Sequence, residues 1–465
     1  MDKILFTQFQ KTDKFNDISN NIYNRKSQLI QGINEEGLAY LACNLLDKSA
    51  DKILILTNNE AKSKRYEEQI KAYTKDFVRI QPKEFILYNV DALSRDIEHA
   101  RTNALNKLLT SKKIVVTASI NSVITRVIPK DKFKDNIIEL KYGKSYELDE
   151  LKKRLLKLKY ERVDAVEGRG QFSVRGGIID IFSPSETNPC RIEFFDDEID
   201  SIRLIDLKTQ RSIKNQKSIK IIPCSDVILD EDEIKHILVE VEKDYNKRLG
   251  KLQGSPEPKD TIKKLNNLYN SYCSRLRDGL TIENRDLLVP FIKNDFENVL
   301  DYFDNDSLII VDEPERIFEE IKILNESFQI KYSELFEKGE VFSKQNKIYY
   351  DEHDIKTKIL GKNYISVNSR LNKIIEVEDI VQFLFKEASS YYGKIEDLAK
   401  DLNRLKYKGY KIAIVLSDQE SCKKLHILLN DYECRTVLSS DSNIEAGSGQ
   451  VILIKGDLKK GFEFC

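Results

Sequence analysis

The chain has 465 residues, of which 76 are basic and 77 acidic, giving a formal net charge of -1. Hydrophobic residues make up 40% and charged residues 33%, a balance typical of a well-packed globular protein that excludes a disordered chain. The near-neutral charge also excludes an overall field that would attract nucleic acid, so any DNA contact must come from a local patch. A chain of this length is expected to form three or four separately cored units.

The seven cysteines include no C-x-x-C pair and indicate neither a disulfide framework nor a zinc site. The four histidines are far apart in the sequence and form no metal-binding motif, so we expect no metal site. Since no apolar run approaches the roughly 20 residues of a membrane span, we expect a cytoplasmic protein without membrane contact.

Residues 1–130 alternate short apolar runs with amphipathic segments, which predicts the first half of an α/β domain with a parallel sheet. The second of its expected helices has Ser94 as a candidate N-cap. Strands are expected at 28–30, 53–57 and 114–118, and helices at 61–71 and 94–109.

A degenerate phosphate-binding loop follows the first strand. Gly32 and Gly37 keep the G-x-x-x-x-G spacing, but the next two residues are Leu38 and Ala39. A working loop needs Lys there to reach the β- and γ-phosphates and Ser or Thr to bind Mg²⁺. Two glutamates inside the loop would also repel a polyphosphate. We therefore expect this site not to bind ATP, and we expect no cofactor for this chain.

Residues 131–215 are expected to form an antiparallel α+β domain inserted into the first domain. Four leucines at helical spacing predict a short basic helix between 148 and 158. Strands are expected at 171–175, 178–182, 191–195 and 199–205.

The strand at 191–195 carries an unusual outward face. Because side chains alternate, Ile192 and Phe194 are expected to face the core, while Arg191, Glu193 and Phe195 face outward. Two charges beside an aromatic ring are typical of an interface centre. The alternative is that Phe195 packs beneath a helix and that the arginines are ordinary surface charges.

The same alternation places Phe172 and Val174 inward and Gln171, Ser173 and Arg175 outward. Arg175 and Arg203 would then join the outward patch if these strands are neighbours. The stretch 141–175 is locally basic, so a DNA-binding module is a further alternative, although a solvated helix face explains the charge as well.

Residues 216–345 are expected to complete the first domain after a charged helical insertion with a loop at 254–258. The apolar strand expected at 308–311 needs a sheet to join, and the simplest topology returns it to the first one. It ends in Asp312 and Glu313, the acidic pair that helicase-type ATPases use to bind Mg²⁺ and position water. A divergent ATPase using this pair is the catalytic alternative, and a buried strand that happens to end in acids is the ordinary one.

The remaining sequence is expected to form a linker at 346–378 and a small α/β domain at 379–465. This domain would contain strands at 411–416 and 451–454 with a helix at 419–429 between them. The apolar ending at 461–465 suggests that the natural chain continues.

Three segments carry a family resemblance, namely YERVD at 160–164, GQFSVRGGIIDIF at 170–182 and RIEFFDDEIDSIR at 191–203. They closely resemble the UvrA-binding domain shared by UvrB and the bacterial transcription-repair coupling factors. Weaker resemblance extends over nearly the whole chain. It implies a degenerate helicase-type, RecA-like parallel sheet domain with an inserted UvrA-binding domain and a further small α/β domain.

Two departures from the UvrB pattern favour the coupling factors. The alternative is a UvrB-like protein, a helicase-fold ATPase of excision repair. Leu38 replaces the lysine of the phosphate loop, and the stretch 87–114 is too short for the DNA-clamping hairpin of UvrB. The resemblance implies a non-catalytic module that recruits UvrA. It implies a parent that releases RNA polymerase stalled at lesions by ATP- and Mg-dependent translocation on double-stranded DNA, through C-terminal domains absent from this chain.

The resemblance also implies which residues contact UvrA. By motif, these positions are Arg175, Arg191, Phe195 and Asp197, with Glu193 beside them on the same strand face. In the family, a C-terminal domain covers this surface through an intramolecular contact until the motor engages.

Overall fold

The computed structural model describes residues 8–83, 95–253, 259–277, 285–292, 296–368, 377–439 and 447–464. The helix start predicted at Ser94, the loop predicted at 254–258 and part of the stretch 87–114 lie outside these residues. Among the described helices, none combines the length and the apolar character that a membrane span requires.

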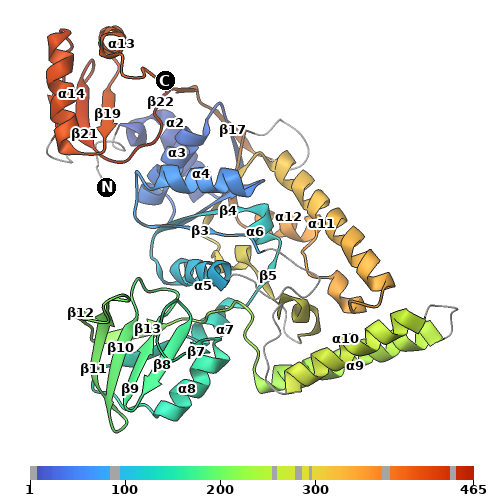
Figure 1. The fold of residues 1–465 in the computed structure, drawn as a ribbon. Helices are drawn as coiled ribbons and strands as arrows, with labels where there is room; N and C mark the ends of the chain where they lie inside the picture. The colour runs from blue at the N-terminus through green and yellow to red at the C-terminus, as the bar shows by residue number, and fades with distance from the viewer. Residues whose placement is uncertain are drawn as a thin grey trace.

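A seven-stranded parallel sheet forms the centre of the molecule (Figure 1). Its strand order is β17-β1-β16-β15-β2-β4-β3, and every neighbouring pair is parallel. The predicted α/β architecture with a parallel sheet is confirmed. The strands are β1 (Gln28–Gln31), β2 (Lys52–Thr57), β3 (Phe77–Ile80), β4 (Ile114–Ser119), β15 (Leu308–Asp312), β16 (Asn363–Val367) and β17 (Asp379–Gln382).

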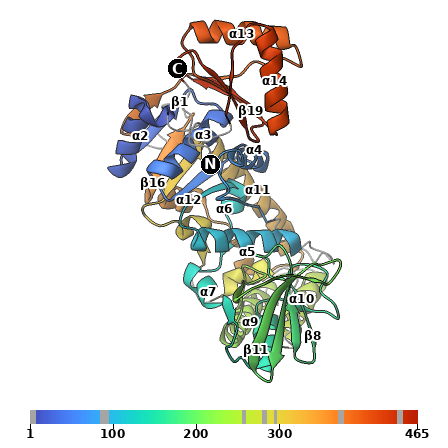
Figure 2. The same cartoon turned by 90° about the vertical axis from the view of Figure 1, so that its left-hand side faces the viewer.

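Helices cover both faces of this sheet (Figure 1 and Figure 2). Ile53 and Ile55 of β2 belong to one buried cluster, whereas Leu54 and Leu56 belong to the other. A parallel sheet buried on both faces requires such continuous apolar strands. The first cluster includes residues of α2 (Asp13–Tyr23), α3 (Glu35–Lys48) and α4 (Glu60–Ile70), and the second includes residues of α5 (Arg95–Thr110), α11 (Pro314–Glu337) and α12 (Glu352–Leu360).

The chain returns to this sheet after the insertion, as the sequence predicts, because β15 lies between β2 and β16. The segment 346–378, predicted as a linker, instead contributes α12 and the inner strand β16. The polar residues of this strand do not indicate a buried strand in the sequence. In the structure Asn363 is buried, and its side-chain amide donates a hydrogen bond to the Ile22 carbonyl at 2.8 Å. Strand β17 joins the same sheet, so the boundary predicted at 379 falls inside the sheet domain.

An antiparallel domain is inserted between β4 and β15 (Figure 1). Its six strands have the order β12-β11-β10-β9-β8-β7, and all neighbours are antiparallel except β7 and β8. Helix α8 (Leu148–Lys157) buries Leu151 and Leu155 against its inner side. A separate antiparallel pair, β6 (Ile138–Lys141) and β13 (Ser218–Ile221), joins the beginning and end of the domain. The six strands are β7 (Glu161–Arg162), β8 (Gln171–Arg175), β9 (Ile178–Ile181), β10 (Cys190–Phe195), β11 (Glu198–Ile205) and β12 (Ser212–Asn215).

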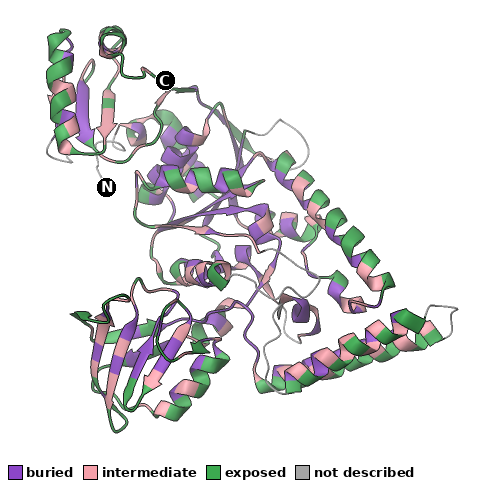
Figure 3. Cartoon of the chain, viewed as in Figure 1, coloured by how far each residue is buried: buried purple, intermediate pink, exposed green. Residues whose placement is uncertain are grey.

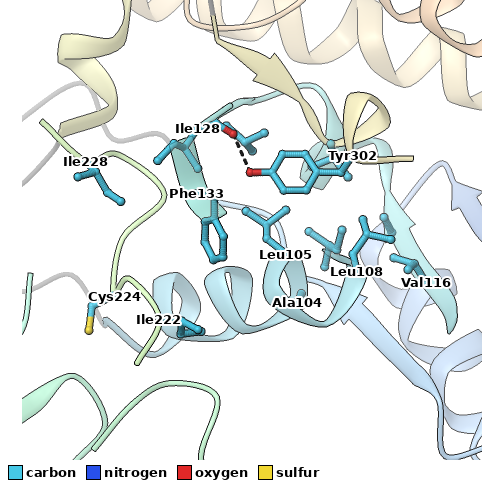
Figure 4. Close-up of a cluster of buried hydrophobic side chains, with 14 of the residues drawn as sticks. Ala104, Leu105, Leu108, Val116, Ile128, Phe133, Ile222, Cys224, Ile228 and Tyr302 are labelled. Carbon is cyan, nitrogen blue, oxygen red and sulfur yellow. Dashed lines mark hydrogen bonds between the residues drawn. The ribbon is translucent and has the colours of Figure 1, made fainter. Parts of the chain in front are cut away.

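One apolar core runs from the parallel sheet into the inserted domain (Figure 4). Leu105 of α5 and Phe133 are fully buried in it together with Ile222, which follows β13. The Tyr302 hydroxyl donates a hydrogen bond to the Ile128 carbonyl at 2.7 Å and satisfies its polar end in this core. The orientation of the inserted domain is therefore fixed by shared buried packing.

A helical arm projects from the body of the molecule (Figure 1). It consists of α9 (Glu231–Gln253) and α10 (Lys259–Arg277), whose facing rings of Tyr245 and Tyr269 stack at 4.2 Å between centroids. The arm has its own apolar cluster, to which Ile237 and Leu265 belong. It accounts for the charged helical insertion that the sequence predicts.

A small α/β unit follows the sheet domain. Its parallel three-stranded sheet has the order β19-β21-β20. The chain enters through β18 (Phe385–Glu387) and leaves through β22 (Phe462–Phe464), which pair antiparallel and are called the aromatic ribbon below. Buried residues concentrate in the central sheet, whereas the small unit and the arm are largely exposed (Figure 3). The unit contains α13 (Ile395–Tyr407), β19 (Ile412–Leu416), α14 (Gln419–Asp431), β20 (Val437–Leu438) and β21 (Val451–Lys455).

Candidate functional site

The degenerate phosphate loop lies between β1 and α3, and the chain's own backbone runs along it. A Cβ atom at Gly32 would lie 2.0 Å from the Phe383 carbonyl oxygen, and one at Gly37 would lie 2.3 Å from the Phe385 ring. The Phe383 amide donates to the Gln31 carbonyl at 2.8 Å, and the Phe385 amide donates to the Gly32 carbonyl at 2.9 Å. The two glycines thus accommodate a neighbouring segment of protein at the place where a phosphate loop faces its ligand.

The two residues after the loop belong to the core. Leu38 and Ala39 are fully buried in the cluster that underlies α3. The aromatic ribbon packs on the same region, where the ring centroids of Phe462 and Tyr40 are 5.1 Å apart and those of Phe464 and Phe9 are 5.2 Å apart. Positions 38 and 39 therefore fill space in an apolar layer.

The acidic pair at the end of β15, Asp312 and Glu313, has a cationic partner. Lys62 of α4 places its Nζ 2.8 Å from Asp312 Oδ2 and 2.6 Å from Glu313 Oε2. Tyr66 donates its hydroxyl to the same Asp312 oxygen at 2.5 Å. Burial opposes the charge on Lys62, but the two carboxylates outweigh burial and raise its pKa. Lys62 supplies the positive charge that Mg²⁺ would supply in a working site.

The glutamates of the loop are also paired. Both Glu35 carboxylate oxygens accept from Arg65 at 2.7 Å, and this hydrogen bonding lowers the pKa of Glu35. Lys460, which precedes the aromatic ribbon's second strand, lies 3.8 Å from Glu36. The charge that would repel a polyphosphate is thus neutralised within the protein.

The second candidate site is the outer side of the inserted sheet, away from α8, called the outer face below. Strand register sets its side chains in two rows. One row is Ser173, Asp180, Arg191 and Arg203. The other is Arg175, Ile178, Glu193 and Ser201. The strands predicted to carry Arg175 and Arg191 are separated by β9, whose residues Ile178 and Asp180 therefore belong to the same face.

Arg191 is held in a bidentate ion pair across two strands. Its Nε and Nη2 atoms donate to the two carboxylate oxygens of Asp180, each at 2.8 Å. Asp180 is only 5% exposed, so this guanidinium neutralises a nearly buried charge. A third contact, from Nη2 to Gln210 Oε1 at 3.2 Å, fixes the outer edge of the guanidinium.

Glu193 is likewise held on both sides. It accepts a hydrogen bond from the Ser201 hydroxyl at 2.8 Å and forms an ion pair with Arg203. Both charged side chains of this pair are about one-third exposed. The outer face therefore presents oriented charges with their partners in place, a preorganised arrangement for recognition.

Phe195 stands at the end of β10 and is 76% exposed. This exposure contradicts the alternative in which the ring packs beneath a helix. Asp196 and Asp197 form the following turn, with Asp196 in the left-handed region at φ 53° and Asp197 exposed. The Tyr146 amide donates to the Asp197 carbonyl at 2.7 Å, which anchors the turn to the preceding loop.

The remaining predicted positions differ in exposure. Arg175 is exposed, and its guanidinium donates to the Asp164 carbonyl at 2.7 Å. Ser173, expected to point outward, is buried in the row that contains the Arg191 and Asp180 pair. Phe172 is buried, and Val174 packs partly buried against the core, as the alternation predicts.

Comparison with known proteins gives this geometry a context. Residues 138–226 match the UvrB interaction domain family, a range that includes the whole outer face and the pair β6 and β13. The chain is 26% identical over 468 residues to the transcription-repair-coupling factor of Staphylococcus haemolyticus (strain JCSC1435), an alignment that covers 100% of this chain and 39% of the relative. The whole chain matches transcription-repair-coupling factors.

Two further coupling factors match over the same extent. That of Staphylococcus epidermidis (strain ATCC 12228 / FDA PCI 1200) is 26% identical over 467 residues and 100% of this chain. That of Staphylococcus aureus (strain MRSA252) is 26% identical over 464 residues and 99% of this chain. In both cases the alignment covers 39% of the relative, so the chain spans well under half the length of these coupling factors.

Several residues of these sites escape sequence reasoning. The period-two pattern of β9 is sufficient to place Asp180 and Ile178 on the outer face once that strand is known to be central. Lys62 carries no comparable signal, because its partner Asp312 is 250 residues away and meets it only after α4 docks on the sheet. The aromatic ribbon also carries no signal in the sequence, because the whole small unit separates its two strands along the chain.

Proposed function

We propose that this chain is a non-catalytic docking module through which a transcription-repair-coupling factor recruits UvrA. The supporting observation is the outer face, which lies within the region matching the UvrB interaction domain. It presents an exposed aromatic ring, Phe195, beside the oriented charges of Arg175, Arg191 and Glu193. Asp197 in the exposed turn adds a carboxylate at its end. Aromatic and arginine side chains of this kind supply most of the binding free energy at protein interfaces.

The decisive experiment measures the affinity of purified UvrA for this chain. Phe195→Ala and Arg175→Ala are the informative variants, because both side chains are exposed and neither supports the fold through a buried partner. Each is expected to weaken binding by about thirtyfold, equivalent to about 2 kcal/mol. Tyr407→Ala is the matched control, since this tyrosine is 95% exposed on the small unit. Unchanged affinity in both test variants would exclude the proposal.

We propose in addition that the sheet domain serves as a scaffold that binds no nucleotide. Three contacts support this: Leu38 is buried in the core, the Phe383 carbonyl lies against Gly32, and Lys62 neutralises Asp312. These residues do not fit ATP with Mg²⁺, which needs a free loop backbone and an uncompensated carboxylate. Titration with ATP and Mg²⁺ to millimolar concentration is expected to give no saturable signal. Saturable binding would favour the alternative, a UvrB-like ATPase.

The activities of the complete coupling factor are proposals about a longer protein, because the chain spans 39% of the relatives' length. We infer that such a protein recognises RNA polymerase stalled at DNA lesions and releases it by ATP-driven translocation on double-stranded DNA. This chain would then supply the link to repair. A C-terminal domain that covers the outer face within the same molecule would lower UvrA affinity relative to this chain alone, which a side-by-side binding measurement tests.

A further inference from the structure

A cleft of about 690 Å³ lies at the junction of the helical arm and the sheet domain. Its walls come from α9, from β5 (Arg126–Val127) and from the short 3₁₀ helices η2 (Arg285–Phe291) and η4 (Ser343–Asn346) with the residues that follow them. This volume falls within the range of ligand-binding clefts in proteins. None of its described lining residues lies between 138 and 226, so the cleft is separate from the segment that matches the UvrB interaction domain.

The lining of the cleft is positively charged. Five basic and two acidic residues contribute to it, an excess of three positive charges on a chain whose net charge is -1. Both acids have partners within the protein. Hydrogen bonds from Lys243 at 2.8 Å and from Lys344 at 2.5 Å lower the pKa of Glu240 to about 2. Asp244 accepts a hydrogen bond from the Ser343 amide at 2.6 Å. The excess charge therefore comes from the three other basic residues.

These three cations are Arg126, Lys247 and Lys347. None of them forms an ion pair with a carboxylate of the described residues, and both lysines are exposed. The Arg126 Nε atom is buried and has no hydrogen-bond partner within the described part of the chain. A guanidinium carries five N–H donors, and an anion placed between like charges lowers their mutual repulsion. The three cations are therefore suited to bind an anionic group of a partner.

Arg126 is held in a fixed position by an aromatic ring. Its guanidinium lies over Tyr350, with 4.6 Å between the Cζ atom and the ring centroid. Tyr350 is buried, and it donates its hydroxyl to the Phe296 carbonyl at 2.7 Å and its amide to the Ile124 carbonyl at 3.0 Å. A guanidinium fixed in this way loses little side-chain entropy on binding. Its planar shape suits a carboxylate, which it can bind through two parallel hydrogen bonds.

Apolar residues also line the cleft, namely Val289, Pro290, Ile292 and Phe296. Ile292 and Phe296 are only partly buried against the apolar cluster of the arm. A nucleic-acid strand would be expected to use a continuous basic track and exposed rings for stacking. Here the two acids interrupt the basic lining, and Phe296 is half-buried. A peptide that combines carboxylates with an apolar side chain matches this lining better.

We propose that the cleft is a second docking site, which binds an acidic segment of a partner protein that carries an apolar side chain beside its carboxylates. Arg126, Lys247 and Lys347 bind the carboxylates, while Pro290 and Ile292 contact the apolar side chain. The site is independent of the UvrA docking proposed above, because no residue of the outer face contributes to its lining.

The test titrates the whole chain into a short fluorescent peptide of Glu, Asp and Leu at low salt and measures fluorescence anisotropy. Arg126→Gln removes the fixed guanidinium and is expected to weaken binding by about tenfold. Lys247→Gln combined with Lys347→Gln removes two exposed charges and is expected to weaken binding by about three- to tenfold. The matched control is Lys251→Gln combined with Lys338→Gln, which removes the same charge from exposed positions outside the cleft.

Two further probes test the chemistry of the ligand. A peptide in which Ser replaces each Leu is expected to bind about tenfold more weakly, because it loses the apolar contact. Oligothymidylate, a single-stranded nucleic acid, is expected to bind more weakly than the acidic peptide. Thermal unfolding confirms that each variant is folded, and the exposed lysine pair keeps the test valid if Arg126→Gln is not.

Each outcome decides for or against the cleft. Loss of peptide affinity in Arg126→Gln and in the variant of Lys247 and Lys347, with the control unchanged, supports the proposal. An equal loss in the control variant would show a general attraction to positive charge and would overturn it. Tighter binding of oligothymidylate, lost in the same variants, would assign the cleft to nucleic acid instead. The proposal is also wrong if the wild-type chain gives no saturable binding of the acidic peptide.

Discussion

Arg191 donates hydrogen bonds to both carboxylate oxygens of Asp180 at 2.8 Å. A residue expected to contact UvrA therefore also stabilises the sheet. Replacing Arg191 by Ala leaves the nearly buried Asp180 without its cation. We expect the free energy of unfolding of this variant to be lower by about 1–3 kcal/mol, because an unpaired buried charge destabilises the folded state. Adding Asp180→Asn should restore part of the lost stability. Urea unfolding of the single and double variants measures both effects.

This coupling complicates any binding measurement on Arg191→Ala. A weaker complex could reflect a disturbed sheet as well as a lost contact. The double variant Arg191→Ala with Asp180→Asn isolates the contact, because it removes both charges together. Equal stability of the wild type and Arg191→Ala would show that the ion pair does not support the fold.

Lys62 is expected to be essential for the stability of the sheet domain. Lys62→Met keeps the length and apolar stem of the side chain but leaves the fully buried Asp312 without a counter-charge. The expected loss is about 3–5 kcal/mol, the usual effect of breaking a buried pair. Lys64→Met, on the exposed side of the same helix, should change stability by less than about 0.5 kcal/mol. Similar losses in both variants would contradict a specific role for Lys62.

We expect stability to depend on pH through His99. It lies on α5 against Gly170 of the inserted domain, where a Cβ on that glycine would lie 2.5 Å from the imidazole Nε2. Burial lowers the pKa of His99 to about 4, with Asp96 favouring the charged form and Arg95 and Arg169 opposing it. The pKa of an unfolded histidine is about 6.5, so below that value the unfolded chain binds the proton more tightly.

Stability should therefore fall as the pH decreases from about 6.5 to about 4 and change little from this source below or above that window. The contribution of His99 is expected to be about 2–3 kcal/mol. His99→Gln should flatten the dependence, whereas His353→Gln, at an exposed position, should leave it unchanged. Urea unfolding at several pH values provides the measurement, and an unchanged slope in His99→Gln would refute the assignment.

Two glycine substitutions are expected to have opposite effects. Gly32→Ala forces a Cβ to within 2.0 Å of the Phe383 carbonyl oxygen at a residue with φ 73°. It should destabilise the protein by about 2 kcal/mol or more. Gly250→Ala lies in α9 with open space around the new methyl group, so it should stabilise the protein by about 0.5–1 kcal/mol. Thermal unfolding of the two variants tests the pair, and a stabilising Gly32→Ala would show that the loop can move away.

The sequence predicts the sheet domain where apolar runs are continuous. Strands β2, β4 and β15 are buried on both faces and contain continuous runs of Ile, Leu and Val at 53–56, 114–116 and 308–311. Strand β16 is equally buried but contains the polar residues Asn363 and Ser366, and the Asn363 amide finds its partner, the Ile22 carbonyl, only in the folded protein. The hydrophobic pattern therefore predicts a linker at this position. A pattern based on hydrophobicity cannot identify a strand whose polar atoms are satisfied by tertiary contacts.

The outer face was more predictable than the nucleotide site. Alternation along β10 separates Arg191, Glu193 and Phe195 from the core residues, because strand geometry fixes the period. The sequence shows that positions 38 and 39 are Leu and Ala, not the Lys and the Ser or Thr of a phosphate loop, but it does not show the segment that covers the loop. Its contact joins Gly32 to Phe383, two residues brought together by a strand pair at the edge of the sheet.

The segment from Phe383 to the aromatic ribbon limits what substitutions in the loop could achieve. Point mutations that restored Lys at position 38 and Thr at position 39 would not recreate a phosphate cradle. The Phe383 carbonyl would still lie against Gly32, and the Phe385 ring would still cover Gly37. Both strands of the ribbon also tether the small unit, so withdrawing them would detach that unit. A phosphate-binding loop at residues 32–37 would therefore require the chain around residues 383–385 to move, in addition to the two substitutions.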